Sequence, residues 1–360
     1  MLDGYRAGLA WLAHSGIQKE SGGVCRYYAA DTGQYRNIST EITGYAIQAY
    51  ATLPPSGEPG LLSHALRAGQ FLCYDTGDSP AGLLPFETPV SGFPPSGTAY
   101  FFDCGIVVRA LLALWNTTSD PQWVERAERC ATAMITHMSR VDGSFFPMAD
   151  LGTLQSRCGE GRWSEEPHVH QLKVAMGFLA LAETTGSTMF SKAADQLLAW
   201  ALRNHELFLP GSEKPDEVAD RLHAYCYFLE GLLPFLQRRL DCSQVLQGGI
   251  TRVEKLAGET RRSLERSDVL AQLLRLRLLA DYLGGFELDV SAASWEAESI
   301  PAFQLFTNDK KTNGAFSFGR REGRLEPHAN PVSTIFCLQA LRMWQDYHNG
   351  ELRTTWAELI

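Results

Sequence analysis

Several features that would assign a function class are missing from this sequence of 360 residues. No apolar run reaches the ~18–20 residues that span a bilayer, so we expect no membrane-spanning helix and no membrane partner. Lys and Arg total 32 against 41 Asp and Glu, which gives a net charge of −9. This shortage of positive charge argues against a nucleic-acid partner, because phosphates bind a basic face.

Targeting and metal-binding signals are also missing. The first residues, MLDGYR, contain no basic segment followed by an apolar stretch, so we expect no signal peptide. The eight cysteines form no CxxC or CxH pair, and several lie in apolar helical runs. Free cysteine behaves as a small buried hydrophobe. We therefore predict reduced core thiols in a cytoplasmic protein, with no metal and no cofactor.

What the sequence does contain is a set of six strongly apolar segments with polar starts. A helix that is apolar nearly all round is typically buried on both sides, so we predict six inner helices. They begin at Glu41, Asp103, His168, Leu222, Asp268 and Pro331.

Amphipathic segments alternate with these inner helices. In residues 122–138, Val124, Ala127 and Cys130 share one stripe, and the charged residues lie off it. We predict outer helices of this kind at residues 5–13, 61–73, 122–138, 190–205, 244–258 and 291–306. Glycine turns follow several of them, at Gly22, Gly82, Gly143 and Gly314.

The order of outer helix, glycine turn and inner helix occurs about six times. One hairpin cannot bury its inner helix, whereas six closed in a ring can. No linker or composition break divides the chain. The sequence therefore predicts an all-α fold, an (α/α)6 toroid of six helical hairpins with short β-hairpins in the loops, as a single domain over residues 1–360.

Polar residues cluster at the predicted starts of the inner helices, where the helix dipole favours anionic groups. We expect them to line one shared cavity, a central funnel. The candidate catalytic residues are Glu41, Asp103, His168, His170, His223 and Asp268. The candidate substrate-binding residues are Tyr45, Trp163, Lys173, Tyr225, Gln272, Arg321 and His328.

Each candidate has a structural alternative. The carboxylates Glu41, Asp103 and Asp268 could serve only as helix caps or dipole partners. His168 and His170 point roughly 200° apart on a helix, so they are not an i,i+4 metal pair. His223 and Tyr225 are two positions apart, and we expect one of these two side chains to pack in the core. Arg321 belongs to a basic cluster beside His328, which could bind an anion or be solvated.

Several motifs together resemble a known superfamily. They are STEITGY (39–45), FFDCG (101–105), VDGSFF (141–146), VHQLKVAMGFLAL (169–181) and LHAYCYFLEGLL (222–233). The set is similar to the six-hairpin toroid superfamily, which includes six-hairpin glycosidases, sugar 2-epimerases and the helical domain of glucuronyl C5-epimerases. It most resembles uncharacterised bacterial toroid proteins of polysaccharide-biosynthesis type.

This resemblance implies a carbohydrate-active protein with a saccharide ligand, and favours an enzyme: a glycoside hydrolase, a lyase or an epimerase, acting on a saccharide that could contain a uronate. Glu41 and Asp103 would be its acid and base. A non-catalytic saccharide-binding or scaffold protein of polysaccharide biosynthesis is an alternative. An isoprenoid- or peptide-processing toroid is another, although the zinc and DxDD motifs of those families are missing. The oligomeric state stays open.

Overall fold

The computed structural model describes residues 2–53, 58–75, 81–91, 94–210 and 213–360. The chain forms two compact units. The mid-chain unit comprises residues 16–26 and 35–204, and the terminal unit comprises residues 1–15, 27–34 and 205–360. Each unit is built almost entirely from paired α-helices.

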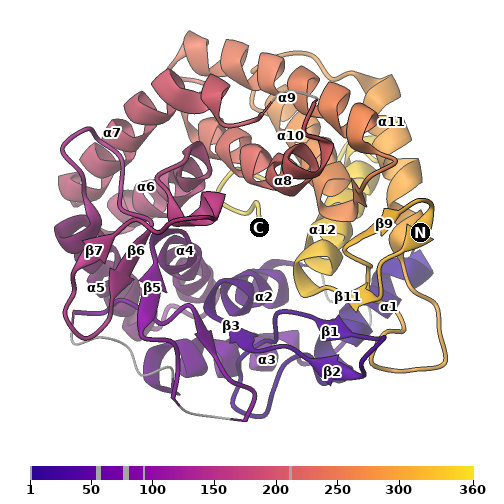
Figure 1. Cartoon of the computed structure of the whole chain (residues 1–360), viewed down its shortest axis with the longest axis horizontal. Helices are drawn as coiled ribbons and strands as arrows, with labels where there is room; N and C mark the ends of the chain where they lie inside the picture. Colours follow the sequence, from indigo (N-terminus) through magenta and orange to yellow (C-terminus); the bar gives the residue numbers. More distant parts are fainter. Residues whose placement is uncertain (1, 54–57, 76–80, 92–93, 211–212) are drawn as a thin grey trace. The chain divides into compact units, whose positions relative to one another are not determined.

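The mid-chain unit contains three helical pairs, in which α2, α4 and α6 pack on α3, α5 and α7 respectively. Figure 1 shows α2, α4 and α6 in consecutive colours from indigo to magenta, and α4 contacts both of the others. The helices are α2 (Thr40–Thr52), α3 (Leu61–Gln70), α4 (Phe101–Thr118), α5 (Pro121–Met138), α6 (Lys173–Thr185) and α7 (Thr188–Asn204).

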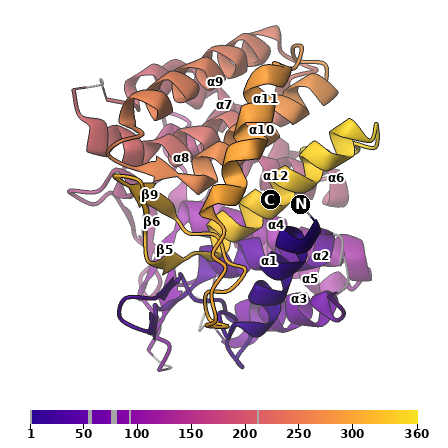
Figure 2. The same cartoon turned by 90° about the vertical axis from the view of Figure 1, so that its right-hand side faces the viewer.

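The terminal unit also contains three pairs: α8 with α9, α10 with α11, and α12 with α1. Figure 2 shows the first and last helices, α1 and α12, side by side. The helices are α1 (Leu2–His14), α8 (Pro215–Leu232), α9 (Leu240–Thr260), α10 (Ser267–Tyr282), α11 (Val290–Ser299) and α12 (Pro331–His348).

Burial separates the two helix classes as the apolar periodicity predicts. Every residue of α10 from Ser267 to Ala280 is buried, and so are most residues of α2, α4, α6, α8 and α12. The partner helices bury one stripe; in α5 this stripe includes Ala127, Cys130 and Met134. The predicted inner and outer segments are therefore confirmed as helices, with two outer segments shortened.

Some helix ends differ from the predicted ones. The outer segment at 61–73 changes to a π-helical turn at Phe71–Asp75, and the one at 291–306 ends in a 3-10 turn at Ile300–Phe303. The inner segment predicted from Leu222 begins at Pro215, because proline fits the first helical position and Asp216 and Glu217 complement the helix dipole.

Short strands connect the helices. In the mid-chain unit β3 (Ile38–Ser39) pairs with β4 (Glu87–Thr88), and β6 (Met148–Asp150) lies between β5 (Thr98–Tyr100) and β7 (Ser156–Arg157). In the terminal unit β1 (Tyr28–Ala29) pairs with β11 (His328–Ala329), and β9 (Gly319–Arg321) lies between β8 (Glu265–Arg266) and β10 (Arg324–Leu325). β2 (Gln34–Tyr35) follows β1 in its sheet.

Two glycine turns show why glycine is required after an outer helix. Gly22 has φ +100° and Gly314 has φ +94°. A Cβ atom would lie 2.2 Å from the carbonyl oxygen of Arg67 at the first and of Ala7 at the second. Both the backbone angle and the close approach exclude a side chain. The turn thus packs directly on α3 in one unit and on α1 in the other.

The longest apolar helix of the mid-chain unit, α4, passes a length-and-composition test for a membrane span. Its mean hydropathy is 1.2, and 67% of it is buried inside the structure. Buried core helices pass the same test.

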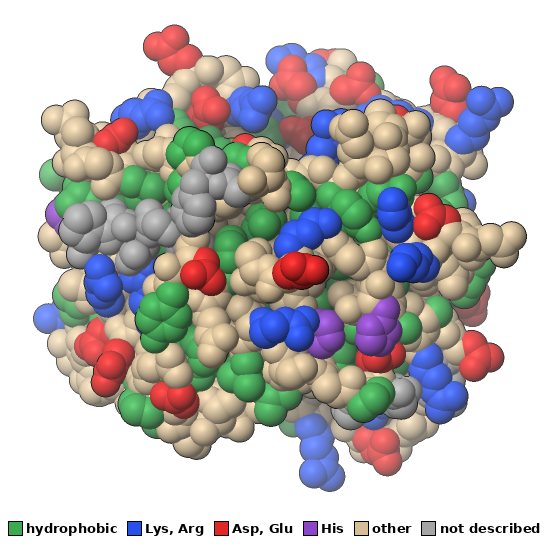
Figure 3. Space-filling model, turned by 90° about the horizontal axis from the view of Figure 1, so that it is seen from below, with side chains coloured by type: hydrophobic (Ala, Val, Ile, Leu, Met, Phe, Trp, Pro, Cys, Tyr) green, Lys and Arg blue, Asp and Glu red, His purple; other side chains and the backbone are tan. Residues whose placement is uncertain are grey.

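Figure 3 shows one face of the protein, on which the described acidic and basic side chains are interspersed among apolar ones.

Candidate functional site

Two carboxyl groups stand at the starts of neighbouring helices in the mid-chain unit. Glu41 is the second residue of α2, and Asp103 is the third residue of α4. The residue that caps α2 is Ser39, whose side chain accepts from the Ile42 amide, and the residue at the cap of α4 is Tyr100. Neither carboxylate is therefore the N-cap of its helix.

Burial makes both carboxyl groups harder to ionise, and the charge of Glu41 adds to this effect at Asp103. Asp103 is buried at 8% exposure, and Glu41 is partly buried. Burial, followed by the nearby Glu41 charge, holds the pKa of Asp103 well above its usual range. Burial also raises the pKa of Glu41, while Arg26 and Lys173 oppose that rise. This pattern is typical of paired carboxyl groups in active sites.

Lys173 is the first residue of α6 and has no exposed surface. Its ammonium lies 5.0 Å from the centre of the Tyr45 ring, a cation–π distance. A cation at a helix N-terminus opposes the helix dipole, and a buried cation needs a counter-charge. Glu41 supplies that negative charge, since the two side chains interact electrostatically.

His170 lies in the 3-10 turn Val169–Leu172 that precedes α6, and it is buried at 4% exposure. Its ring is 5.4 Å from that of Phe102 and 5.2 Å from that of Trp163. His168 lies apart from this group: it is partly exposed, and its Nε2 is 3.5 Å from Glu166. Of the two histidines, only His170 is enclosed by aromatic rings.

Sequence reasoning missed Arg26 and Tyr100. Arg26 follows the Gly22 turn, its guanidinium lies 5.4 Å from the Phe86 ring, and it is 3.9 Å from Glu87. Tyr100 packs edge-on against Phe86 at 5.2 Å, and its pKa is raised by burial and by nearby acidic groups that include Asp103. Arg26 is 15 residues from Glu41, so no local spacing indicates the pairing.

The terminal unit also has a carboxylate at a helix start, Asp268, but this one is paired with an arginine. Asp268 is the second residue of α10, and Arg266 binds it through two hydrogen bonds, Nε–Oδ1 at 2.9 Å and Nη2–Oδ2 at 2.6 Å. Both side chains are 5% exposed. Although burial opposes it, the Arg266 pair lowers the pKa of Asp268. Asp268 is therefore a fixed carboxylate in a buried ion pair.

His223 is not at a helix start, contrary to the prediction, because α8 begins at Pro215. Burial and the neighbouring Arg266 lower the pKa of His223 to about 4, so the ring is neutral at pH 7. Its backbone carbonyl accepts a hydrogen bond from Gln272 at 3.3 Å, and its ring meets Tyr227 edge-on at 5.7 Å. His223, Gln272 and Asp268 thus share one neighbourhood.

Tyr225 is separated from that neighbourhood. Its hydroxyl is 3.1 Å from Nδ1 of His205, and its ring stacks on Phe208 at 6.4 Å. It is 1% exposed. The expectation that one member of the 223 and 225 pair packs in the core is confirmed, and that residue is Tyr225.

The two remaining candidates lie in short strands before α12, Arg321 in β9 and His328 in β11. Arg321 is exposed, pairs with Glu326 at 2.9 Å and donates to the Ser263 carbonyl. His328 is partly exposed and lies 4.5 Å from the Tyr27 ring. The Arg321 guanidinium is therefore exposed and paired with a carboxylate of its own hairpin.

The structure thus brings candidates together in two groups. Glu41, Asp103, Tyr45, Trp163, Lys173 and His170 belong to the mid-chain group, and His223, Asp268 and Gln272 to the terminal group. The cavity shared by all of them stays a prediction.

All eight cysteines are free, and six are buried. Cys158 is exposed, so the prediction of core packing is wrong for this residue, which lies in the loop before α6. Among the described residues, no three His, Cys, Asp or Glu side chains form a group that could hold a metal ion.

The chain is similar to solved structures along nearly its whole length. A sugar epimerase from a ruminal bacterium has 12% identity and a TM-score of 0.68, over 95% of this chain and 98% of that one. Cellobiose 2-epimerase from Bacillus thermoamylovorans has 11% identity, a TM-score of 0.68 and the same coverage. A D-mannose isomerase has 9% identity and a TM-score of 0.67, over 95% and 96%. No protein-family model and no curated protein sequence matches the chain.

The chain has the (α/α)6 fold. The fold prediction and the resemblance to six-hairpin proteins are confirmed. At this level of identity the likeness shows the fold alone, and the chemistry has to be argued from the side chains.

Proposed function

We propose that this protein is an enzyme that acts on a saccharide, with Glu41 and Asp103 as its acid/base pair. The observation that carries the proposal is the pair of helix-start carboxyls whose pKa values are both raised, each by burial and Asp103 also by the charge of Glu41. A glycoside hydrolase requires one protonated acid and one carboxylate beside the scissile bond.

The surroundings divide the two roles. Asp103 has the more strongly raised pKa, so it keeps its proton at higher pH and suits the general acid. Glu41 has Arg26 and Lys173 to stabilise its charge, so it suits the base or nucleophile. Both cations act on the ionised form, which is the form that the second carboxyl needs.

A saccharide fits the side chains around this pair. Phe86, Tyr100 and Trp163 are all partly exposed, and pyranose C–H faces stack on such rings. Arg26 beside Phe86 adds a donor for hydroxyl or carboxylate oxygens. The names of the similar structures, sugar epimerase, cellobiose 2-epimerase and D-mannose isomerase, support the same ligand class.

An epimerase or isomerase is the second candidate. The same three names favour it, and such reactions need a neutral base beside the sugar carbon. His223 is neutral at pH 7, but a pKa of about 4 makes it a weak base. His170 is the other candidate base, buried between the rings of Phe102 and Trp163. The carboxyl pair therefore favours hydrolysis.

The test is a panel of reducing sugars, oligosaccharides and uronate-containing oligosaccharides, assayed for hydrolysis, elimination and epimerisation. We expect the protein to hydrolyse one class of these saccharides. Glu41→Gln or Asp103→Asn should lower kcat/KM by roughly 10²–10⁴-fold. Asp195→Asn, an exposed carboxyl on α7, is the matched control and should keep full activity. Full activity in both site variants would refute the assignment.

Two further points are proposals of the same kind. We propose that residues 1–360 act as one domain, because each unit contains three hairpins of a six-hairpin fold. A cytoplasmic location fits eight free thiols, one of them exposed, since reduced cysteine is maintained in that compartment.

A further inference from the structure

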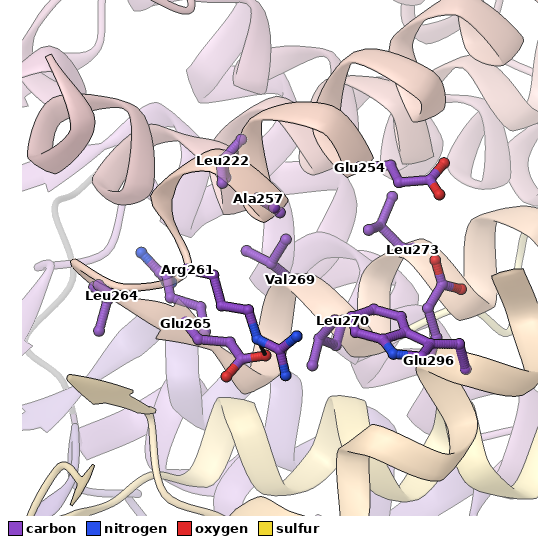
Figure 4. Close-up of a pocket in the computed structure, with 13 residues that line it drawn as sticks. Leu222, Glu254, Ala257, Arg261, Leu264, Glu265, Val269, Leu270, Leu273 and Glu296 are labelled. Carbon is purple, nitrogen blue, oxygen red and sulfur yellow. Dashed lines mark ion pairs between the residues drawn. The ribbon is translucent and has the colours of Figure 1, made fainter. Parts of the chain in front are cut away.

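A pocket of about 240 Å³ opens in the terminal unit among α9, α10 and α11 (Figure 4). Its floor is apolar, from side chains that include Val269, Leu270 and Leu273. Figure 4 shows Arg261 and Glu265 on one side of this floor and Glu254 and Glu296 on the other. None of these residues belongs to the acid/base pair proposed above.

The charges around the pocket do not balance on the Glu254 side. One guanidinium, Arg277, serves two carboxylates: Nη2 is 2.8 Å from Glu254 and Nε is 2.9 Å from Glu296. On the other side Glu265 is bound by Arg261 at 2.8 Å and also by Arg320. The Glu254 side therefore has one more negative than positive charge, and the Glu265 side has one more positive than negative charge.

Glu296 carries an unused acceptor at this place. The residue is 1% exposed, and its Oε2 atom is buried with no hydrogen-bond partner among the described residues. An unsatisfied buried carboxylate oxygen costs free energy. Burial accordingly raises the pKa of Glu296 to about 7, against the opposing effect of Arg277, and Glu254 and Asp289 raise it further.

Trp295, the neighbour of Glu296 on α11, lines the same pocket and is 46% exposed. The Arg261 guanidinium lies 5.5 Å from the centre of its ring. An exposed indole next to excess negative charge and an apolar floor suits a ligand that is both cationic and apolar, because a cation is attracted to the ring face and to the carboxylates.

We propose that this pocket binds a small organic ammonium ion, whose N–H groups donate to Glu296 and Glu254 and whose apolar body lies on the leucine floor beside Trp295. An anion is disfavoured on this side of the pocket, where the two carboxylates Glu254 and Glu296 share the single charge of Arg277. A neutral alcohol could donate one hydrogen bond but would leave the second carboxylate charge uncompensated.

Phenethylamine is a suitable probe, because its ring and short chain match the floor and its amine stays protonated at pH 8, with a pKa near ~10 as for lysine. Binding is measured by calorimetry against two analogues of the same shape, 2-phenylethanol and phenylacetate. We expect saturable binding of the amine, at least tenfold tighter than the alcohol, and no binding of the acid.

Two variants locate the site. Trp295→Ala changes an exposed residue and should weaken amine binding at least tenfold, as should Glu296→Gln. Glu298→Gln is the matched control, because Glu298 is an exposed carboxylate on the same helix and outside this pocket. If Glu296→Gln fails to fold, Trp295→Ala decides the location.

The pH dependence provides a separate measure. The amine requires ionised Glu296, so its affinity should rise about tenfold between pH 6 and pH 8, around the pKa of about 7. The affinity of 2-phenylethanol should stay flat. No amine binding, equal binding of amine and alcohol, unchanged binding in Trp295→Ala, or an amine affinity independent of pH would each overturn the proposal.

Discussion

Asp103 and Asp268 stand at nearly the same place in two helices, but their pKa values are shifted in opposite directions. Each lies in the first turn of a buried helix, α4 in the mid-chain unit and α10 in the terminal unit. The pKa of Asp103 is raised, by burial and Glu41. The pKa of Asp268 is lowered, because Arg266 binds both of its oxygens. The first is free to exchange a proton, and the second is fixed in its charged form.

The difference shows that a helix-start position does not decide what a carboxylate does. The helix dipole favours the charged form of a carboxylate at both positions. At an exposed helix start this effect is typically less than about 1 kcal/mol. Burial and the partner contribute more than that at each position. Two buried or half-buried histidines also have different surroundings: Arg266 helps to keep His223 neutral, whereas His170 contacts the rings of Phe102 and Trp163.

The largest expected effect comes from making the same substitution at both positions. Asp268→Asn leaves the Arg266 charge buried without its counter-charge, so we expect unfolding free energy to fall by about 3–5 kcal/mol. Asp103→Asn removes a carboxylate that burial disfavours, so stability should change by less than about 1 kcal/mol or increase. Urea unfolding of both variants at pH 7 measures this, and equal losses would remove the distinction.

Acid should reduce the contribution of the terminal group to folding stability, and should not reduce that of the mid-chain group. The folded-state pKa of His223, about 4, lies below the unfolded value near 6.5. Its contribution is therefore fully present above pH 6.5 and is lost as pH falls toward 4, by about 2 kcal/mol at pH 5 and about 3 kcal/mol at pH 4. The raised pKa values of Glu41 and Asp103 have the opposite sign: their contribution is present below pH ~4 and is lost as pH rises through the folded-state values.

Urea unfolding at pH 7 and pH 5 should show this loss in the wild type and a smaller one in His223→Gln. His137→Gln, which changes a histidine in the last turn of α5 in the other unit, is the control. It should lose as much unfolding free energy between pH 7 and pH 5 as the wild type does. An unchanged pH dependence in His223→Gln would mean that another group titrates in this range.

A smaller effect tests how Glu41 is kept charged. Lys173→Met removes a buried ammonium and keeps the side-chain volume, so the pKa of Glu41 should rise further. Carboxyl ¹³C NMR titration measures this without any enzymatic assay. Lys192→Met, at an exposed lysine on α7, should leave the titration unchanged. A downward shift in Lys173→Met would contradict the role of its charge.

The smallest expected effects lie at two helix caps, where the units should behave alike. Ser39 caps α2 by accepting from the Ile42 amide, and Asn330 caps α12 by accepting from the Ser333 amide at 3.1 Å. Ser39→Ala and Asn330→Ala should each lower unfolding free energy by about 1 kcal/mol. Thermal unfolding measures both losses. A loss several-fold larger at one cap would show that its side chain does more than cap the helix.

Particular elements show how far sequence reasoning reached into the fold. The starts of α2, α10 and α12 were predicted to within one residue, because a polar residue there precedes a long apolar run. The start of α8 was missed, since its first turns are charged and half exposed and therefore lack the apolar signal. The shortened helix α11 ends where Ile300 and Pro301 begin a 3-10 turn.

For the sites, the residue types were predictable and their partners were not. Glu41, Asp103 and Lys173 all stand at helix starts, and the polar residues before apolar runs indicated them. Arg26 was missed because it reaches the site through a loop whose path is fixed by packing, and Tyr100 was missed because it ends a short strand, β5, directly before the apolar run of α4. The pocket beside Trp295 was missed because packing brings its walls together from four different helices.

The sequence by itself determined the fold class, because apolar periodicity and glycine turns recur with each hairpin and only mutual burial satisfies six such helices. It also indicated that Glu41, Asp103 and Asp268 stand in the first turns of three of those helices, although it misplaced His223. Tertiary structure alone decided their protonation. Whether a buried carboxyl keeps its proton depends on which charge lies within a few ångströms, and Arg266 beside Asp268 or Glu41 beside Asp103 is placed there by packing.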